Sequence, residues 1–540
     1  MGIFIQLFIK PSLIEPLAWA QFYDDAYLLL RSHPDGLMSR RSKKAPGGTR
    51  HYYSRDLEFE PENDRLRHLM ICGDQTSHRF AERFYLFRDL GRYQTQTQKE
   101  VPKDILELLL DPKDGVTTVF DAKTQGYPYH FPLLAVAMLA EDYFPLGAHA
   151  SGDIELAQAE EARTWAQEVL GRPLALPVSV NSPMLWQRLT QILTPEAAAE
   201  AFSKLYRGDS EDSLGVLIPL LGVVEARRWL CHYLGEYTSP DQFGVVKSFV
   251  HWLNSTGDLV QLLEVACLAP EGPRWPPEPV IRTVAATWTT LEPASLAFFQ
   301  PLQRPVGQPA GVWGQMLGVL LDMGGIGRHI RRHIPLDEAA AIVRRVFPRE
   351  ADVLEALLRE ESAQRSKVLE KLNTPLTRRI EAAKESAAEH DPERLLTCTS
   401  VMDLPEKKQQ HLRLLTFRMM EVEQQSAKEP RYAKLLEGSP DVLRSFVLYL
   451  LEERFVLTEA AWRQIDEETD LGVLRFLASV GVLQFNELRF PEFRTGVLEN
   501  AELRRSLVRL MEDPVIYEAT ARELAEARKE MEGNTVTPQG

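Results

Sequence analysis

The sequence predicts an α+β multidomain protein in which an N-terminal α/β domain is followed by largely α-helical regions. Strand-like and helix-like patterns alternate over the first part of the chain, as they do in α/β domains. Further along, apolar residues recur at spacings of three and four, which is typical of helices that bury one face. A chain of 540 residues is also too long for one hydrophobic core. We therefore expect an α/β domain over residues 1–180, a helical region over 181–310 that ends in a proline-rich connection, and a helical C-terminal region over 311–540.

The composition narrows the class of protein before any motif is considered. Hydrophobic residues make up 44% and charged residues 26%, which is ordinary for a soluble protein. A net charge of −15 repels phosphate backbones, so the sequence carries no strong nucleic-acid signal, and such binding is disfavoured unless a local basic patch overrides this charge. The four cysteines form no CxxC pair, which favours a reducing cytoplasm over a disulfide framework or a zinc site. Because no apolar run approaches the roughly 20 residues that cross a bilayer, and no signal peptide is evident, we expect no membrane association.

The first part of the α/β domain is expected to contain a strand, a helix, a basic loop and two further strands. Residues 3–9 form an apolar run that predicts a strand covered on both faces, and residues 16–31 carry helical spacing. Residues 39–50 are basic and contain glycine, so we expect a solvated loop there. Strands are predicted at residues 52–59 and 67–72.

The next segment predicts a strand end followed by a helix. Gly73-Asp74 terminates the strand, and Thr76 or Ser77 is a suitable N-cap. The expected helix runs through Phe80, Phe84 and Phe87, and a further short strand is expected at residues 117–120.

The stretch from residue 121 to residue 171 is expected to organise the domain. It predicts an aromatic loop, an apolar helix with Pro132 in its first turn, a strand at 147–150, a turn, and a helix from Ile154 with Asp153 as its cap. The helix is too apolar to lie anywhere but inside the domain.

The remainder of the chain is expected to be mostly helical, without a fixed repeat period. Thr194 is predicted to cap the helix that follows it. Residues 483–490 predict a small hairpin or extended piece, and residues 534–540 a loose tail. The expected helices cover residues 185–193, 195–206, 214–234, 243–269, 280–290, 338–346, 351–358, 367–372, 376–390, 406–425, 442–454, 459–465 and 471–480.

The loop before the apolar helix is the first candidate binding site. A helix N-terminus presents free N–H groups that suit an anion. Lys123 and His130 would add donors, Gln125 would add an amide, and Tyr127 and Tyr129 would stack on a flat ligand. The alternative is that these side chains only fasten the loop to the domain, as any loop before a buried helix requires.

The C-terminal end of the same helix carries an electrostatic misfit. Glu141 and Asp142 stand where the helix dipole disfavours carboxylates, so we expect a basic partner such as Arg55 or Arg88. Structural pairing is one interpretation. The other is a general acid or base whose pKa neighbouring charges adjust.

Two Gly-Asp junctions follow predicted strands and suggest a polar cluster at one edge of the sheet. Asp74 follows the strand at 67–72, and Asp153 follows Ser151 and Gly152. With Arg55 and His130 nearby, these carboxylates would divide acid and base roles. Turn and cap chemistry explains both aspartates equally simply.

No nucleotide or hydrolase signature supports a particular reaction. The sequence lacks G-x-G-x-x-G, G-x-x-x-x-G-K-[ST] and G-x-S-x-G. His329 and His333 are four residues apart, but Ile330 occupies the place of a catalytic Glu and arginines surround the pair, so we predict no metal site and no cofactor.

The residues resemble no family closely enough to carry a function over. The leading hypothesis is a cytoplasmic, non-enzymatic interaction or scaffold protein whose helical surfaces bind a protein partner. One alternative is a hydrolase-like enzyme at the sheet edge, which requires Asp74, His130, Glu141 and Asp153 to converge within about 10 Å. A second alternative is a small-anion sensor. Whether the chain is an enzyme is left open.

Overall fold

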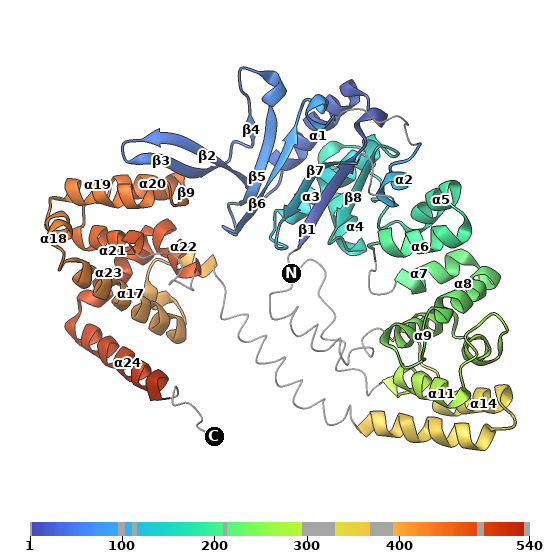
Figure 1. Ribbon diagram of the computed structural model, residues 1–540. Coiled ribbons are helices and arrows are strands. Elements are labelled where there is room, and N and C mark those ends of the chain that lie inside the picture. The colour runs from blue at the N-terminus through green and yellow to red at the C-terminus, as the bar shows by residue number, and fades with distance from the viewer. Residues whose placement is uncertain are drawn as a thin grey trace. The chain divides into compact units, whose positions relative to one another are not determined.

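The computed structural model confirms the predicted class: an N-terminal part with strands and helices precedes mostly helical regions (Figure 1). It describes residues 3–94, 103–110, 116–208, 213–293, 330–367, 393–482 and 491–533. The chain divides into two compact units. The first comprises Met1–Gly36, Glu58–Gly73 and Arg79–Ala383, and the second comprises Leu37–Leu57, Asp74–His78 and Lys384–Gly540. The predicted boundaries near residues 180 and 310 stay a prediction.

The first unit contains a three-stranded sheet with β1 (Phe4–Ile9) at its centre. Its neighbours β7 (Thr117–Lys123) and β8 (Ala148–Gly152) both run antiparallel to it. Alternate residues of β1 are fully buried and the residues between them are partly buried, which gives the strand one core face and one half-covered face. The predicted strand is therefore confirmed, although only one of its faces is fully buried.

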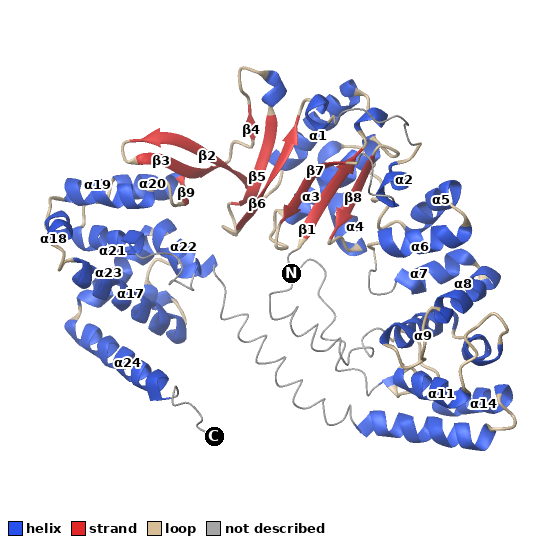
Figure 2. Cartoon of the chain, viewed as in Figure 1, coloured by secondary structure: helices blue, strands red, loops and turns tan. Residues whose placement is uncertain are grey.

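Three helices of the first unit pack against one another and cover this sheet (Figure 2). They are α1 (Pro16–Arg31), α3 (His130–Tyr143) and α4 (Leu156–Leu170). Nearly every residue of α3 is buried, because the helix contacts α1, α4, β1 and β8 together. The indole of Trp19 anchors α1 by donating to the carbonyl oxygen of Phe87 at 3.1 Å.

A second group of strands corrects one sequence prediction. The strands β4 (Glu58–Phe59), β5 (His68–Asp74) and β6 (Phe80–Phe87) pair antiparallel. The predicted helix through Phe80, Phe84 and Phe87 is wrong, because this segment is β6. Phe84 and Leu86 alternate with less buried neighbours, and β5 supplies the hydrogen-bonding partner that local spacing does not reveal.

The helical part of the first unit confirms the helical prediction but divides two of the expected helices. Gly222, at φ 75°, separates α7 from α8 within residues 214–234, and Gly257, at φ 68°, ends α9 within residues 243–269. The left-handed backbone at both positions favours glycine. The Thr194 cap is confirmed, since its side chain accepts from Ala197 N. The helices are α2 (Ile105–Leu110), α5 (Ser182–Ile192), α6 (Pro195–Leu205), α7 (Ser213–Leu221), α8 (Val223–Gly235), α9 (Phe243–Thr256), α10 (Leu259–Leu263), the π-helical η4 (Glu264–Leu268), α11 (Pro277–Ala286), α14 (Leu336–Val346) and the helical residues 351–367.

The second unit joins an N-terminal hairpin to the C-terminal helices. The predicted loop over residues 39–50 is wrong, because β2 (Leu37–Ala45) and β3 (Gly48–Ser54) pair antiparallel there. β3 also pairs in parallel with β9 (Val456–Thr458) through residues 51–53, so the strand that follows the basic segment has a partner about four hundred residues away in sequence. The unit's helices are α16 (Glu393–Thr397), α17 (Glu406–Ser426), α18 (Pro430–Leu436), α19 (Pro440–Leu451), α20 (Glu459–Asp466), α21 (Leu471–Val482), α22 (Pro491–Glu499), α23 (Ala501–Glu512) and α24 (Pro514–Gly533).

Some sequence predictions fall beyond the described ranges. The helix at 376–390, the extended piece at 483–490, the tail at 534–540 and His329 lie outside the described residues. In the part of the chain that is described, no helix has both the length and the apolar character needed to cross a membrane.

Candidate functional site

The loop that leads into α3 is fastened to the beginning of the sheet. The hydroxyl of Thr124 lies 2.6 Å from His130 Nδ1 and 3.3 Å from the carbonyl oxygen of Ile3. Gln125 adopts a left-handed conformation, with φ 58°, and its backbone N–H donates to the same carbonyl at 3.1 Å. The buried His130 thus closes the loop onto its own helix, as the structural alternative expects.

The aromatic residues of this loop differ in their exposure. Tyr129 is fully buried and donates its hydroxyl to the carbonyl oxygen of Glu82 at 3.2 Å. Burial raises the pKa of Tyr129 far above its ordinary value. Tyr127 is only partly buried and lies under the guanidinium of Arg79, 5.8 Å from its ring centroid. The backbone N–H of Lys123 donates to Glu82 Oε2 at 3.0 Å. Of the two predicted stacking residues, only Tyr127 has a ring near the surface.

Glu141, in the last turn of α3, holds the outer edge of β8. Its Oε1 accepts from Ala150 N and its Oε2 from Val178 N, both at 2.7 Å. Ser179 Oγ donates to the carbonyl oxygen of Ala150 at 2.9 Å, so both outward-facing backbone groups of this residue are satisfied. His149 Nδ1 lies 3.3 Å from Glu141 Oε1 without hydrogen-bond geometry. The carboxylate therefore completes an edge strand and ties it to the segment after α4.

Asp142 has a different basic partner from the one that the sequence suggested. Arg172 Nη1 lies 2.7 Å from Asp142 Oδ2, and Ala175 N donates to Oδ1 at 3.3 Å. The proposed pairing with Arg55 or Arg88 is wrong: Arg88 lies beside other carboxylates, and Arg55 is an exposed residue of the second unit. The true partner follows α4 directly, where the chain turns back along α3.

Asp153 does not cap α4. Its Oδ2 accepts from Phe4 N at 2.7 Å, which extends the β1–β8 ladder by one side-chain bond. The helix begins later, at Leu156, and its N-cap Glu155 makes no side-chain capping bond. Ser151 lies opposite Gln6 in the β1–β8 register and is buried. The cap prediction fails because the nearest orphan donor belongs to the first strand and not to the following helix.

The candidate acid and base residues are distributed over separate local structures. Asp74 belongs to the second unit, is fully buried, and accepts from Ser77 N and Ser77 Oγ, both at 2.6 Å. His130 and Glu141 occupy the first and last turns of α3, about 16 Å apart along the helix axis at 1.5 Å per residue. The loop residues Lys123, Gln125, Tyr127, Tyr129 and His130 are brought together, whereas α3 separates them from Glu141.

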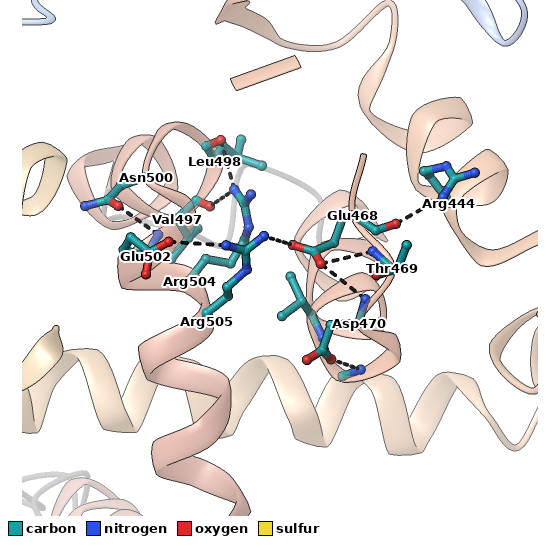
Figure 3. A network of polar contacts seen from close by, with 12 residues as sticks. Arg444, Glu468, Thr469, Asp470, Val497, Leu498, Asn500, Glu502, Arg504 and Arg505 are labelled. Carbon is teal, nitrogen blue, oxygen red and sulfur yellow. Dashed lines mark hydrogen bonds and ion pairs between the residues drawn. The ribbon is translucent and has the colours of Figure 1, made fainter. Parts of the chain in front are cut away.

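A buried arginine in the second unit was missed by the sequence reasoning (Figure 3). Arg504 of α23 is fully buried, and its Nη1 donates to the carbonyl oxygens of Val497 at 2.8 Å and Leu498 at 3.1 Å. Its Nε and Nη2 have no hydrogen-bond partner among the described residues. Burial lowers the pKa of Arg504 to about 10.

Two carboxylates lie around this arginine and are held by other donors. Glu468 accepts from the backbone N–H groups of Thr469 and Asp470 at 3.0 and 3.2 Å, and from Arg505 Nη2 at 3.1 Å. Glu499 accepts from the backbone and hydroxyl of Thr458, and burial raises its pKa above the ordinary value. Both charges favour the charged form of Arg504. The network joins the connection between α20 and α21 to α22 and α23, and Arg504 and Glu468 within it are buried.

The sequence does contain a signal for this arginine. The buried positions of α23 include Leu503, Leu507, Val508 and Met511, and Arg504 falls within the same apolar stripe. A charged residue on the buried face of an amphipathic helix marks a polar site in the core.

Comparison with known proteins does not assign these sites. No family model, no curated protein and no solved structure matches the chain. Among the described residues, His, Cys, Asp and Glu side chains form no group of three that could hold a metal ion. The function is therefore argued from the contacts and exposure of individual residues.

We expect Glu141→Ala to loosen the outer edge of β8. The change leaves two buried N–H groups without an acceptor, at a cost of about 2 to 4 kcal/mol. Hydrogen exchange at Ala150 and Val178 should accelerate strongly, and Glu161→Ala, an exposed position of α4, should leave both amides unchanged. Equal exchange rates in the two variants would show that Glu141 does not support this edge.

We expect Arg504→Met to be tolerated better than Arg504→Ala. Methionine keeps the apolar stem and removes a buried charge, whereas alanine also leaves a cavity that costs about 2 to 5 kcal/mol. Stability of α23 is measured by native-state hydrogen exchange in both variants. If the alanine and methionine variants are equally stable, packing around the stem has no role.

The lowered pKa of Arg504 also predicts a pH dependence. Its folded pKa of about 10 lies below the ordinary arginine value, so the folded state releases this proton first as the pH rises. The penalty for the buried charge is therefore complete below pH 10 and is relieved above it. The stability difference between wild type and Arg504→Met should change above about pH 10 and stay flat from pH 7 to 9. A stability difference between the two proteins that stays constant up to pH 11 would contradict this prediction.

Proposed function

We propose that the chain is a non-enzymatic protein of the cytoplasm that binds a protein partner through its helical surface. The first support is that the polar residues considered as candidates for a site make contacts that stabilise the fold. Glu141 holds a strand edge, Asp142 is paired with Arg172, and Asp153 extends the β1–β8 ladder. Since these groups are engaged in maintaining the fold, they offer little reactive chemistry.

The observation that carries the proposal is the outward face of α19. Val442 and Tyr449 are 45% and 63% exposed, and a separation of seven residues places them on the same side of the helix. The opposite side is buried in the core of the second unit through Leu443, Val447 and Leu451. Exposed tyrosine flanked by apolar residues is typical of the energetically important part of a protein interface. This face suits an apolar surface of a partner.

The whole chain is the appropriate bait for finding that partner. Residues 311–540 alone would lack the β2–β3 hairpin, which supplies the strand beside β9 and belongs to the same compact unit. The unpaired edge of β9 would then expose backbone groups that promote non-specific association.

We expect the α19 face to determine partner binding. A photo-crosslinking residue at position 449 of the full chain should capture one discrete protein, and the same residue at position 17 serves as the control. Leu17 is the matched position because it is an exposed apolar residue on a helix of the first unit, α1. The double variant Val442→Ala and Tyr449→Ala should weaken binding of the captured protein about tenfold or more.

Two outcomes would count against this function. One is capture of the same set of proteins from positions 449 and 17. The other is unchanged affinity of the double variant for the captured protein, which would place the interface elsewhere.

A further inference from the structure

The β2–β3 hairpin is held on the second unit by a buried arginine. Arg50 Nε and Nη2 donate to Glu452 Oε1 at 3.2 and 2.8 Å, and Nη1 and Nη2 donate to Asp466 at 2.8 and 3.0 Å. The guanidinium also lies 4.7 Å from the ring centroid of Trp462. Both Arg50 and Glu452 are buried, whereas Asp466 is partly exposed. Two carboxylates and an aromatic face are the groups that recognise a guanidinium specifically.

The surrounding residues bind the backbone of the hairpin as well as its side chain. Trp462 Nε1 donates to the carbonyl oxygen of His51 at 2.8 Å, and Glu453 Oε1 accepts from Thr49 N at 2.6 Å. The N–H of Glu453 donates to the carbonyl oxygen of Thr49 at 2.9 Å. Residues 51–53 then continue in parallel register with β9. Such strand addition provides affinity through the main chain, and a pocket for one side chain provides specificity.

The residues around the hairpin also require a small residue at its turn. Gly47 N donates to Glu452 Oε2 at 3.1 Å, and a Cβ at Gly47 would lie 2.7 Å from that oxygen. Gly48 has φ 155° and lies against the side chain of Glu453. A larger side chain at Gly47 would therefore clash with the carboxylate that binds Arg50. We call the group formed by Glu452, Glu453, β9, Trp462 and Asp466 the arginine socket.

The hairpin and the arginine socket are separate segments with complementary charge. The socket comes entirely from residues 452–466, and the hairpin residues that it binds come from 47–53. The socket contributes three carboxylates. The strand β2, which pairs with the strand that carries Arg50, has four basic residues: Arg40, Arg41, Lys43 and Lys44. The chain on both sides of the hairpin belongs to the first unit. The hairpin and the arginine socket that binds it are therefore about four hundred residues apart in sequence.

We propose that the arginine socket is a strand-binding site that accepts the β2–β3 hairpin from a second copy of this chain when its own hairpin is released. A second copy presents the same glycine turn, arginine and strand, so every contact above can form between two chains. Within one chain the hairpin has the advantage of a high effective concentration, so a second copy can compete only when the affinity of the chain's own hairpin for its socket is weakened. Exchange of an identical element between copies is the usual route to a domain-swapped dimer.

Two full-length variants with opposite defects test this exchange. Arg50→Glu keeps the socket but spoils the hairpin, and Glu452→Arg keeps the hairpin but spoils the socket. Each variant alone should have the mass of one chain by light scattering, whereas the equimolar mixture should contain a heterodimer of twice that mass. The control mixture contains Glu161→Arg, a substitution at an exposed position of the first unit, in place of Glu452→Arg. It should give no heterodimer with Arg50→Glu, because the hairpin of the Glu161→Arg chain already occupies the socket of that same chain. A mixture that stays at the mass of one chain overturns the proposal.

A labelled synthetic peptide of residues 37–57 provides the second measurement. It should bind the full-length Arg50→Gln variant at least ten times more tightly than wild type, whose socket is occupied. The same peptide carrying Arg50→Gln should not bind. Equal affinity for wild type and variant overturns the proposal. Loss of the helical circular dichroism of Arg50→Gln overturns it too, because the hairpin would then be an integral part of the core instead of a separable ligand.

Discussion

The ion pair between Arg50 and Glu452 joins parts of the chain that are about four hundred residues apart. No pattern in the local sequence predicts this pair. Burying both charged groups is unfavourable unless each has hydrogen-bonding partners. Here the guanidinium of Arg50 binds Glu452 and lies over the ring of Trp462, and the glycine turn donates a backbone N–H to Glu452. The pairing of β3 with β9 is part of the same contact between the hairpin and the C-terminal segment. The second unit is thus defined by an interaction between the N-terminal and C-terminal parts of the chain and not by a continuous segment.

Two carboxylates of the first unit, the buried Glu141 and the exposed Asp153, serve a similar purpose. Glu141 satisfies backbone groups on the open side of β8, and Asp153 does so at the start of β1. Both residues attracted attention because carboxylates at the ends of buried elements are also what an active site requires. In each case the group accepts backbone N–H donors that would otherwise be unsatisfied. The polarity at the ends of α3 is accounted for by the edge strand at Glu141, by Arg172 at Asp142 and by the loop residue Thr124 at His130.

The parts of the fold that were predictable are those determined by residues close in sequence. The apolar character of α3 predicts its position and burial, and the apolar run of residues 3–9 predicts the strand β1, although not that only one of its faces is fully buried. The segment of β6 was misjudged because its phenylalanines suit both periodicities and only β5 decides between them. The basic residues of β2 predict a loop because the exposed part of the strand is charged, although its partner β3 follows directly in the chain. Arg504 was visible in the pattern as a charge within an apolar stripe.

The planar fork of Arg50, and not only its charge, holds the hairpin on the C-terminal helices. Hydrogen exchange of the full chain carrying Arg50→Lys tests this directly, because lysine keeps the charge but cannot bridge Glu452 and Asp466 with a planar fork. Faster exchange is expected at residues 51–53 and 456–458, with no change at Ala150 of the first unit. Unchanged protection of both strands would contradict it.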